Sequence, residues 1–280
     1  MGYKGRLFNR EGVFYCGDYL DGDIYPVFQQ AGKRRKRCKP TSEIQERLNQ
    51  KNAEKTLTRT VHMNFDENDL ALHLTYRKGV EPADEAEALR NVQNFLRRAK
   101  RRYRKTGIEL KYVYTTEYGK KNGRVHHHLI LTGGIDRNAL EELWGKGYAN
   151  SKRLQFEDDG VTGLAHYMTK DKRRNARFHS TSREEGKERC FYRRWSGSRN
   201  LLHPEPSVID GQLSFDDIGE ITEAIDEKAA HKFFEKRYPG YVLTEAYYVR
   251  NSVNRGVYIH FEMRRRREDE YPGRRRGART

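Results

Sequence analysis

The pattern of hydrophobic and polar residues changes character near residue 56. Upstream, residues 1–40 contain several glycines and no sustained periodicity, which predicts an extended arm. Between residues 56 and 172, strand-like and helix-like periods follow one another, which predicts an organised core. Downstream, residues 171–200 are basic and poor in aliphatic residues, which predicts a loop.

Alternation of apolar and polar residues predicts the strands of this core. Residues 70–76 (LALHLTY) alternate with the period of a strand that buries one face. Two further strands, 109–117 and 124–132, flank residues 118–123, whose Asn-Gly pair is a strong hairpin signal. The other predicted elements are a helix from 41 to about 55, a strand at 61–65, helices at 82–105 and 136–144, a strand at 148–156 and a helix at 162–172.

This order of elements predicts an α+β fold in which helices pack on an antiparallel sheet. Aromatic and aliphatic residues resume at 233–261, in a β-like pattern that follows an acidic stretch. The predicted regions are a basic arm at 1–40, a core at 41–175, a basic and then acidic loop-rich connection at 176–230, an α/β extension packing on the core at 231–263 and an Arg-rich tail at 264–280.

The net charge of the chain narrows the range of its expected partners. Lys and Arg number 56 against 40 acidic residues, which gives a net charge of +16 and favours a polyanionic partner, nucleic acid above all. No apolar run approaches the roughly 20 residues that span a bilayer, and no signal-peptide pattern opens the chain, so an intracellular protein is expected. Three widely spaced cysteines predict reduced thiols and no disulfide framework or structural zinc site.

Three consecutive histidines occupy the second hairpin strand. In a strand, alternate side chains share a face, so His126 and His128 point one way and His127 points the other. Two imidazoles about 7 Å apart on one face can chelate one metal ion. The hairpin brings Glu117 beside them as a third ligand, and two histidines with one carboxylate leave coordination positions open for catalysis.

A tyrosine and a lysine three residues apart follow on a predicted helix. Tyr167 and Lys170 lie on neighbouring faces of that helix, whereas Leu164 and Met168 form its buried stripe. A helical tyrosine usually serves packing. Here it follows a predicted metal-binding strand in a strongly basic protein, and the two features together indicate more than either does alone.

Together these features resemble the HUH endonucleases, and among them the rolling-circle replication initiators, or Rep proteins, of phages, plasmids and single-stranded DNA viruses. The resemblance covers roughly residues 56–172, and His127 departs from it because the family usually has an apolar residue there. Three motifs occur in the family's order: Leu72–Tyr76 as a short apolar strand, His126–His128 after Glu117 as the metal motif, and Tyr167–Lys170 as the Tyr-x-x-Lys motif.

The resemblance implies a ferredoxin- or RRM-like fold and a replication-initiation endonuclease that cuts and rejoins single-stranded DNA at an origin. It implies Tyr167 as the nucleophile that forms a 5′-phosphotyrosine, Lys170 as its assistant, and Mg²⁺ or Mn²⁺ as the metal. No GxxxxGK[ST] phosphate-binding loop occurs, so the chain is expected to need a helicase of the host. A DNA polymerase of the host is a second expected partner. A bacterial cytoplasm is the expected setting. Predicted DNA-binding residues are Thr75, Arg97, Arg98, Arg101, Arg102, Arg124, Lys172, Arg173 and Arg174.

Other functions remain open at this point. A relaxase or a single-Tyr transposase shares the same chemistry. A non-catalytic RRM-like nucleic-acid-binding protein explains the charge but leaves Glu117, His126, His128 and Tyr167 without a role. A cupin-like oxygenase is disfavoured because residues 129–134 hold no carboxylate.

Overall fold

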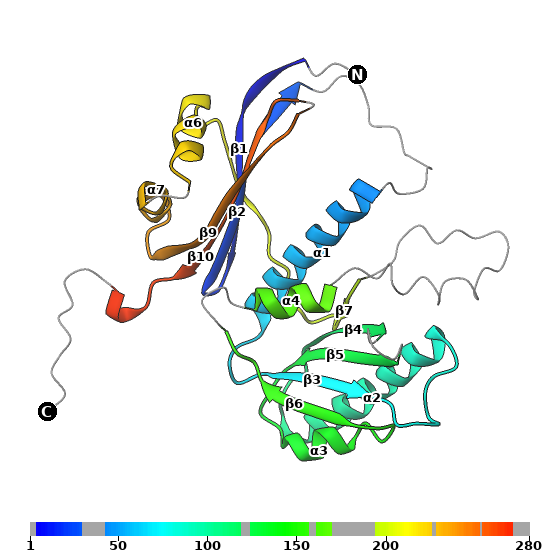
Figure 1. The fold of residues 1–280 in the computed structure, drawn as a ribbon. Helices are drawn as coiled ribbons and strands as arrows, with labels where there is room; N and C mark the ends of the chain where they lie inside the picture. Colours follow the sequence, from blue (N-terminus) through cyan, green and yellow to red (C-terminus); the bar gives the residue numbers. More distant parts are fainter. Residues whose placement is uncertain are drawn as a thin grey trace, which may run out of the picture. The chain divides into compact units, whose positions relative to one another are not determined.

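The chain divides into two units, which are described separately (Figure 1). The central unit contains residues 41–157 and 161–203, and the terminal unit contains residues 1–40, 158–160 and 204–280. The structure is a computed structural model, and it describes residues 4–29, 43–118, 124–156, 161–169, 194–225, 228–252 and 254–270. Within these ranges the strands form two five-stranded antiparallel sheets, one in each unit.

The sheet of the central unit has the strand order β6-β3-β5-β4-β7, with antiparallel pairing throughout. From β3 to β6 the elements follow the β-α-β-β-α-β order of ferredoxin-like folds, which confirms the predicted α+β class. The elements are α1 (Glu43–Asn64), β3 (Leu70–Thr75), α2 (Glu85–Thr106), β4 (Tyr112–Tyr118), β5 (Val125–Leu131), α3 (Arg137–Glu142), β6 (Ala149–Arg153), α4 (Thr162–Thr169) and β7 (Ser196–Gly197).

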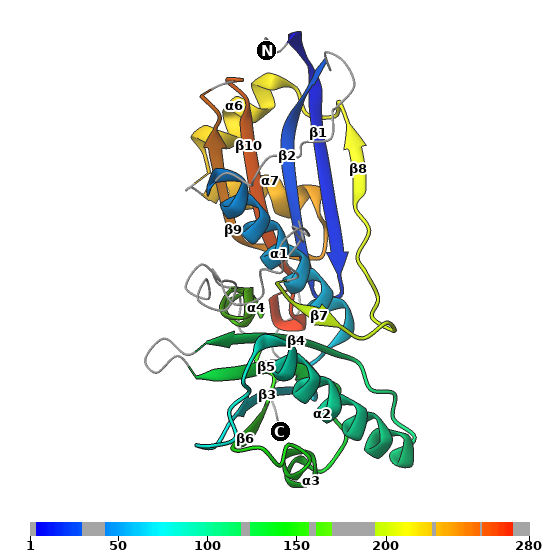
Figure 2. The same ribbon diagram turned by 90° about the vertical axis from the view of Figure 1, so that its right-hand side faces the viewer.

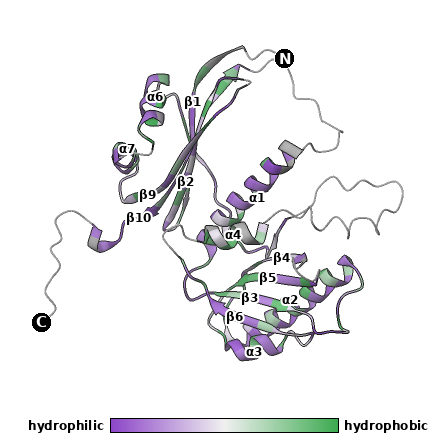
Figure 3. Cartoon of the chain, in the orientation of Figure 1, coloured by the Kyte–Doolittle hydropathy of each residue, from purple (hydrophilic) through white to green (hydrophobic). Residues whose placement is uncertain are grey.

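Helices cover both faces of this sheet, α2 and α3 on one side and α1 and α4 on the other (Figures 1 and 2). Leu72 and Leu129 bury their side chains on the first face, together with Phe95 of α2. Val113 and Ile130 bury theirs on the second face, against α1 and α4. Figure 3 shows the corresponding hydrophobic stretch in β5, whereas α1 is mainly hydrophilic.

Helix α2 has the local signals of a well-defined element. Asp84 precedes it in an extended conformation, and its side chain accepts a hydrogen bond from the Glu87 N–H. Gly107 ends it with φ of 74°, the left-handed conformation that glycine adopts without strain. One stripe of the helix is buried against β3 and β5, whereas its basic residues lie on the remaining surface.

The strand predicted at 61–65 is wrong, because α1 continues to Asn64. Leu57, Val61 and Phe65 are four residues apart, the spacing of one helix face, and all three are buried in the core on the α4 side of the sheet. The apolar residues of 61–65 therefore belong to a helical stripe that begins before them. A window of five residues could not distinguish the two periods.

The terminal unit contains a sheet of order β8-β1-β2-β10-β9, with α6 and α7 on one of its faces. Its elements are β1 (Lys4–Cys16), β2 (Tyr19–Gln29), β8 (Ser207–Asp210), α6 (Phe215–Glu223), α7 (Lys228–Arg237), β9 (Tyr241–Arg250), β10 (Val257–Arg265) and the short 3-10 helix η2 (Glu268–Glu270).

The predicted N-terminal arm is instead a long hairpin, β1 and β2, that pairs with β10 and β8. The extension predicted at 231–263 likewise belongs to this sheet, and α6 lies in the predicted loop-rich connection. The hairpin turns at Gly17, with φ of 68°, and buries Val13, Leu20 and Ile24. Because β10 lies more than 200 residues away in sequence, local periodicity did not indicate this pairing.

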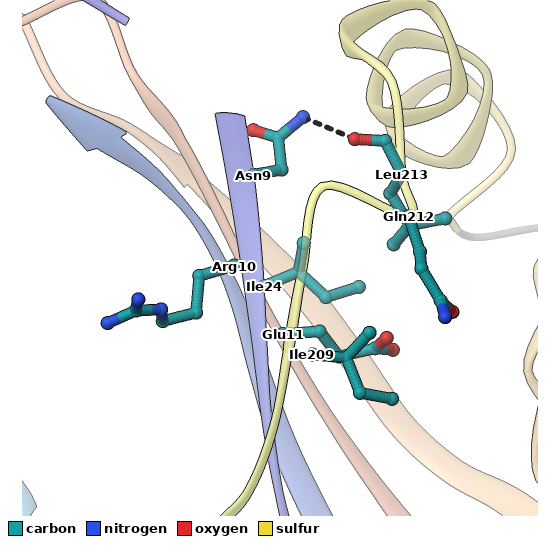
Figure 4. Close-up of a pocket in the computed structure, with 7 residues that line it drawn as sticks. All are labelled: Asn9, Arg10, Glu11, Ile24, Ile209, Gln212 and Leu213. Carbon is teal, nitrogen blue, oxygen red and sulfur yellow. Dashed lines mark hydrogen bonds between the residues drawn. The ribbon is translucent and has the colours of Figure 1, made fainter. Parts of the chain in front are cut away.

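Hydrogen bonds of polar side chains connect the α6–α7 side of the terminal unit to β1. The Asn9 amide donates to the Leu213 carbonyl at 3.0 Å, next to a small hollow (Figure 4). Buried Glu11 accepts three hydrogen bonds from the Arg237 guanidinium and one from the Tyr238 hydroxyl. The carboxylate is therefore fully engaged in holding α7 on the sheet.

The start of the predicted Arg-rich tail also belongs to the terminal unit. Arg264 and Arg265 are the last residues of β10, and Arg264 pairs with Glu270 at 2.6 Å. Arg266 pairs with Glu235 at 2.8 Å. Residues 271–280 lie outside the described residues. In the described part of the chain, no helix has the length and apolar character needed to cross a membrane.

Candidate metal centre and nucleophile helix

The register of the β4–β5 hairpin brings a carboxylate and two imidazoles together. Glu117 pairs directly with His126, and Thr115 pairs with His128. Alternation along each strand then places Glu117, His126 and His128 on one face. This is the face on which α1 and α4 pack, since Val113 and Ile130 share it.

The three side chains are within contact distance. The Glu117 Oε1 atom lies 3.0 Å from His128 Nε2 and 3.5 Å from His126 Nε2. The side chain of Glu117 is 20% exposed, that of His128 12% and that of His126 15%. The cluster is therefore shielded but still accessible to a substrate. Glu117 is half buried, which opposes its ionisation, but its hydrogen bonds and charge interactions with both histidines prevail and hold its pKa well below the usual value.

A third imidazole, which is not among the predicted ligands, lies beside this group. His73 of β3 pairs with His128 of β5, and ligand atoms of His73, His126 and His128 lie within 4.8 Å of one another. Burial, and then the neighbouring His128 and His126, lower the pKa of His73 to about 4. The neutral imidazole that results is the form that coordinates metals. The group of imidazoles could therefore hold a metal ion.

His127 has a different environment from its two neighbours. It is fully buried on the α2 side of the sheet, where Tyr76 Oη lies 2.9 Å from Nε2 and Thr116 Oγ1 lies 2.8 Å from Nδ1. Burial, and then the adjacent His126 and His128, lower the pKa of His127 to about 3. Since both ring nitrogens are occupied, His127 has a structural role.

The helix that carries the predicted nucleophile packs on the same face as the metal cluster. Ala165 and Met168 of α4 are buried with Val113 and Ile130 of the sheet and Val61 of α1. Tyr167 lies between these two residues in the helix, so its backbone belongs to the segment that packs on this face of the sheet. The Tyr167 side chain and all of Lys170 lie outside the described residues.

Tyr76, one of the other tyrosines near the cluster in sequence, is on the opposite side of the sheet. Its ring is buried beside Trp144, and its hydroxyl bonds to His127. Burial raises the pKa of Tyr76 to about 12, so this phenol ionises less readily than a free tyrosine. Tyr76 therefore belongs to the packed α2 side of the sheet and not to the cluster.

Comparison with known proteins adds an independent finding. Residues 69–172 match the family described as replication-associated protein ORF2/G2P. This segment is similar to the replication-associated family, and residues 69–172 are called the Rep domain below for that similarity. The match begins one residue before β3 and ends just beyond α4, so it covers a little over a third of the chain and spans all three predicted motifs. No curated protein and no solved structure matches the chain.

The basic residues predicted to contact DNA are distributed over several parts of the Rep domain. Arg97, Arg98, Arg101 and Arg102 lie on α2, which covers the sheet face opposite the metal cluster. Arg98 donates to the Leu143 carbonyl at 2.8 Å, next to the end of α3, and so has a structural role. Arg101 and Arg102 are exposed on α2.

Two predicted DNA-binding residues of the Rep domain lie on the side of the cluster. Thr75 pairs with His126 in the β3–β5 ladder, and its hydroxyl donates to the Tyr148 carbonyl at 3.2 Å. Arg124 is exposed and directly precedes β5, at the hairpin end nearest to Glu117. Lys172, Arg173 and Arg174 lie outside the described residues.

Proposed function

We propose that this chain is a replication-initiation endonuclease that nicks single-stranded DNA at an origin and rejoins the strands. The observation that carries the proposal is the convergence of Glu117, His126 and His128 on the sheet face against which α4 packs. The match of residues 69–172 to a replication-associated family supports the same conclusion.

The role proposed for Glu117, His126 and His128 is to hold a divalent ion, Mg²⁺ or Mn²⁺. Such an ion, when bound, polarises a phosphodiester and stabilises the charge that develops on its oxygens. Glu117 supplies the negative charge, and its contacts with both imidazoles keep the three donors oriented before any ion arrives. His127 fixes the strand from the opposite face, through Tyr76 and Thr116.

Tyr167 is the proposed nucleophile. Its phenol oxygen forms a bond to phosphorus, the bond from phosphorus to the 3′-oxygen breaks, and the phenol proton leaves while the 3′-oxygen gains one. The product is a 5′-phosphotyrosine with a free 3′-OH, and attack of a 3′-OH on this linkage reverses the step and joins strands. A free tyrosine has a pKa near 10, so only about one in a thousand is ionised at neutral pH, and activation is needed.

Lys170, one residue after α4, is proposed to neutralise charge on the phosphate next to Tyr167. Arg124, at the cluster end of the hairpin, is proposed to hold the DNA backbone near the metal. Exposed Arg101 and Arg102 are proposed to bind the backbone at a distance from the reaction. A helicase and a polymerase of the host are proposed to act on the nicked strand.

A nicking assay tests the proposal. A pool of random single-stranded oligonucleotides, labelled at the 3′-end, is incubated with the protein and Mn²⁺ and then denatured. The expected result is label retained covalently on the protein, lost with a chelator and lost in Glu117→Ala. A protein that binds the pool but never retains label, with or without metal, is the non-catalytic binding protein and contradicts the proposal.

A further inference from the structure

Strand β3, the first strand of the Rep domain, carries His73, which has no role in the proposed function above. His73 lies opposite His128 in the β3–β5 ladder, and the two rings stack at 4.5 Å with an interplanar angle of 8°. The His126 ring lies 5.3 Å from the His73 ring and nearly perpendicular to it. Three imidazoles from two neighbouring strands therefore surround one small volume.

The hydrogen bonds of these residues distinguish a ligand from a packed side chain. The Nε2 atom of His73 is buried and has no hydrogen-bond partner among the described residues. His127, which directly precedes His128 on β5, has a hydrogen-bond partner for each of its ring nitrogens. Buried polar atoms are almost always satisfied, so an unsatisfied nitrogen beside two imidazoles and a carboxylate needs an explanation. A bound metal ion would supply one.

We infer that His73 is a metal ligand, and that the site, with three imidazoles and one carboxylate, selects a first-row transition ion such as Mn²⁺ over Mg²⁺. The inference rests on the metal role proposed for Glu117, His126 and His128. Mg²⁺ prefers oxygen ligands and retains several waters, whereas imidazole nitrogen suits the transition ions. A donor set with three nitrogens therefore disfavours Mg²⁺.

Coordination of one ion requires the stacked rings of His73 and His128 to turn out of their nearly parallel arrangement. Nitrogens about 2.1 Å from one ion in a tetrahedral arrangement are about 3.4 Å apart. The ligand atoms of the three histidines already lie within 4.8 Å of one another. An ion that accepts five or six ligands keeps room for a phosphate oxygen beside the four protein donors.

The test measures metal binding without DNA. Mn²⁺ and Mg²⁺ affinities are measured by calorimetric titration, and pulsed electron paramagnetic resonance of bound Mn²⁺ counts the coordinated imidazole nitrogens. The variant His73→Phe keeps a ring against His128 and removes both nitrogens. His231→Phe makes the same change at an exposed histidine of α7 and serves as the control.

The wild type and His231→Phe are expected to show three coordinated nitrogens and a preference for Mn²⁺. His73→Phe is expected to show two, with a loss of Mn²⁺ affinity of at least about tenfold and a smaller preference over Mg²⁺. Equal nitrogen counts and affinities in the wild type and His73→Phe overturn the inference and leave the proposed site intact. A wild type that binds neither ion overturns the proposed site itself. If His73→Phe fails to fold, His73→Gln gives the same two readings.

Discussion

The two faces of the central sheet use the same residue type in opposite ways. On the α2 face, His127 is buried and its two nitrogens contact Tyr76 and Thr116. On the α4 face, His126 and His128 contact Glu117, and the neighbouring His73 has a buried nitrogen without a hydrogen-bond partner among the described residues. Consecutive residues of one strand therefore belong to a packed core and to a candidate metal centre.

The difference between the faces follows from strand parity and from what covers each face. Large residues such as Phe95 and Trp144 close the α2 face, so every polar group there must find a partner within the protein. On the α4 face, the side chains of the cluster remain 12% to 20% exposed, which leaves access for an ion and a phosphate. Histidines that look equivalent in sequence are distinguished by their hydrogen-bond partners.

Removal of a ligand on the α4 face is expected to have the largest effect on activity. The double variant His126→Ala/His128→Ala should lose at least about a thousandfold in nicking rate, because metal stabilisation of the transition state contributes several kcal/mol. Circular dichroism should show an unchanged fold. A double variant that retains metal-dependent nicking would remove these two residues from the site.

Removal of the imidazole on the α2 face should instead reduce stability. His127→Val leaves the Tyr76 hydroxyl and the Thr116 hydroxyl without their partner in a buried region, which costs about 2–4 kcal/mol of unfolding free energy. Urea denaturation measures this loss. Mn²⁺ affinity of the folded variant should stay within about threefold of the wild type, and a complete loss of Mn²⁺ binding by a folded variant would show that the two faces are not independent.

A smaller change on the same face tests the partner of His127. Tyr76→Phe removes one hydroxyl and should cost about 1–2 kcal/mol in denaturant unfolding. Nicking should persist, because the ring still packs against Trp144 and the β5 strand keeps its register. Loss of covalent DNA attachment in this folded variant would point to Tyr76 as a participant in the reaction.

The smallest effects are expected from arginines of α2. Arg101→Ala should reduce the slope of log affinity against log salt for single-stranded DNA by about 0.7, if the residue neutralises one phosphate. Arg98→Ala should leave that slope unchanged and lower the unfolding free energy by about 1 kcal/mol, because its guanidinium bonds to the Leu143 carbonyl. Equal salt slopes for Arg101→Ala and the wild type would exclude α2 Arg101 from the DNA interface.

Much of the site could be predicted from local sequence alone. Strand parity separated His127 from its neighbours, and the Asn-Gly hairpin signal predicted Glu117 close to the strand of His126. The register pairs these two residues directly. The position of His73 beside His128 depends on pairing between β3 and β5, which lie more than 50 residues apart. Its alternation with Leu72 and Leu74 showed that it faced away from the core, but no local signal named its neighbours.

The terminal unit shows the same limit on a larger scale. β1 and β2 have partly polar faces and acquire their sheet neighbours from β8 and β10, close to the other end of the chain. Glu11 is acidic and yet buried, because Arg237 and Tyr238 reach it from α7. Partners this far away in the sequence can bury a residue that local periodicity assigns to a solvent-exposed arm.

The most direct test of the central proposal is to identify the residue that becomes linked to DNA. Protein retained on labelled single-stranded oligonucleotides in the presence of Mn²⁺ is digested with trypsin and analysed by mass spectrometry. The predicted result is a nucleotide adduct on the peptide of residues 154–170, at Tyr167, that is absent from Tyr167→Phe although this variant still folds and binds DNA. An adduct that persists in Tyr167→Phe, or that maps to another tyrosine, would contradict the proposed mechanism.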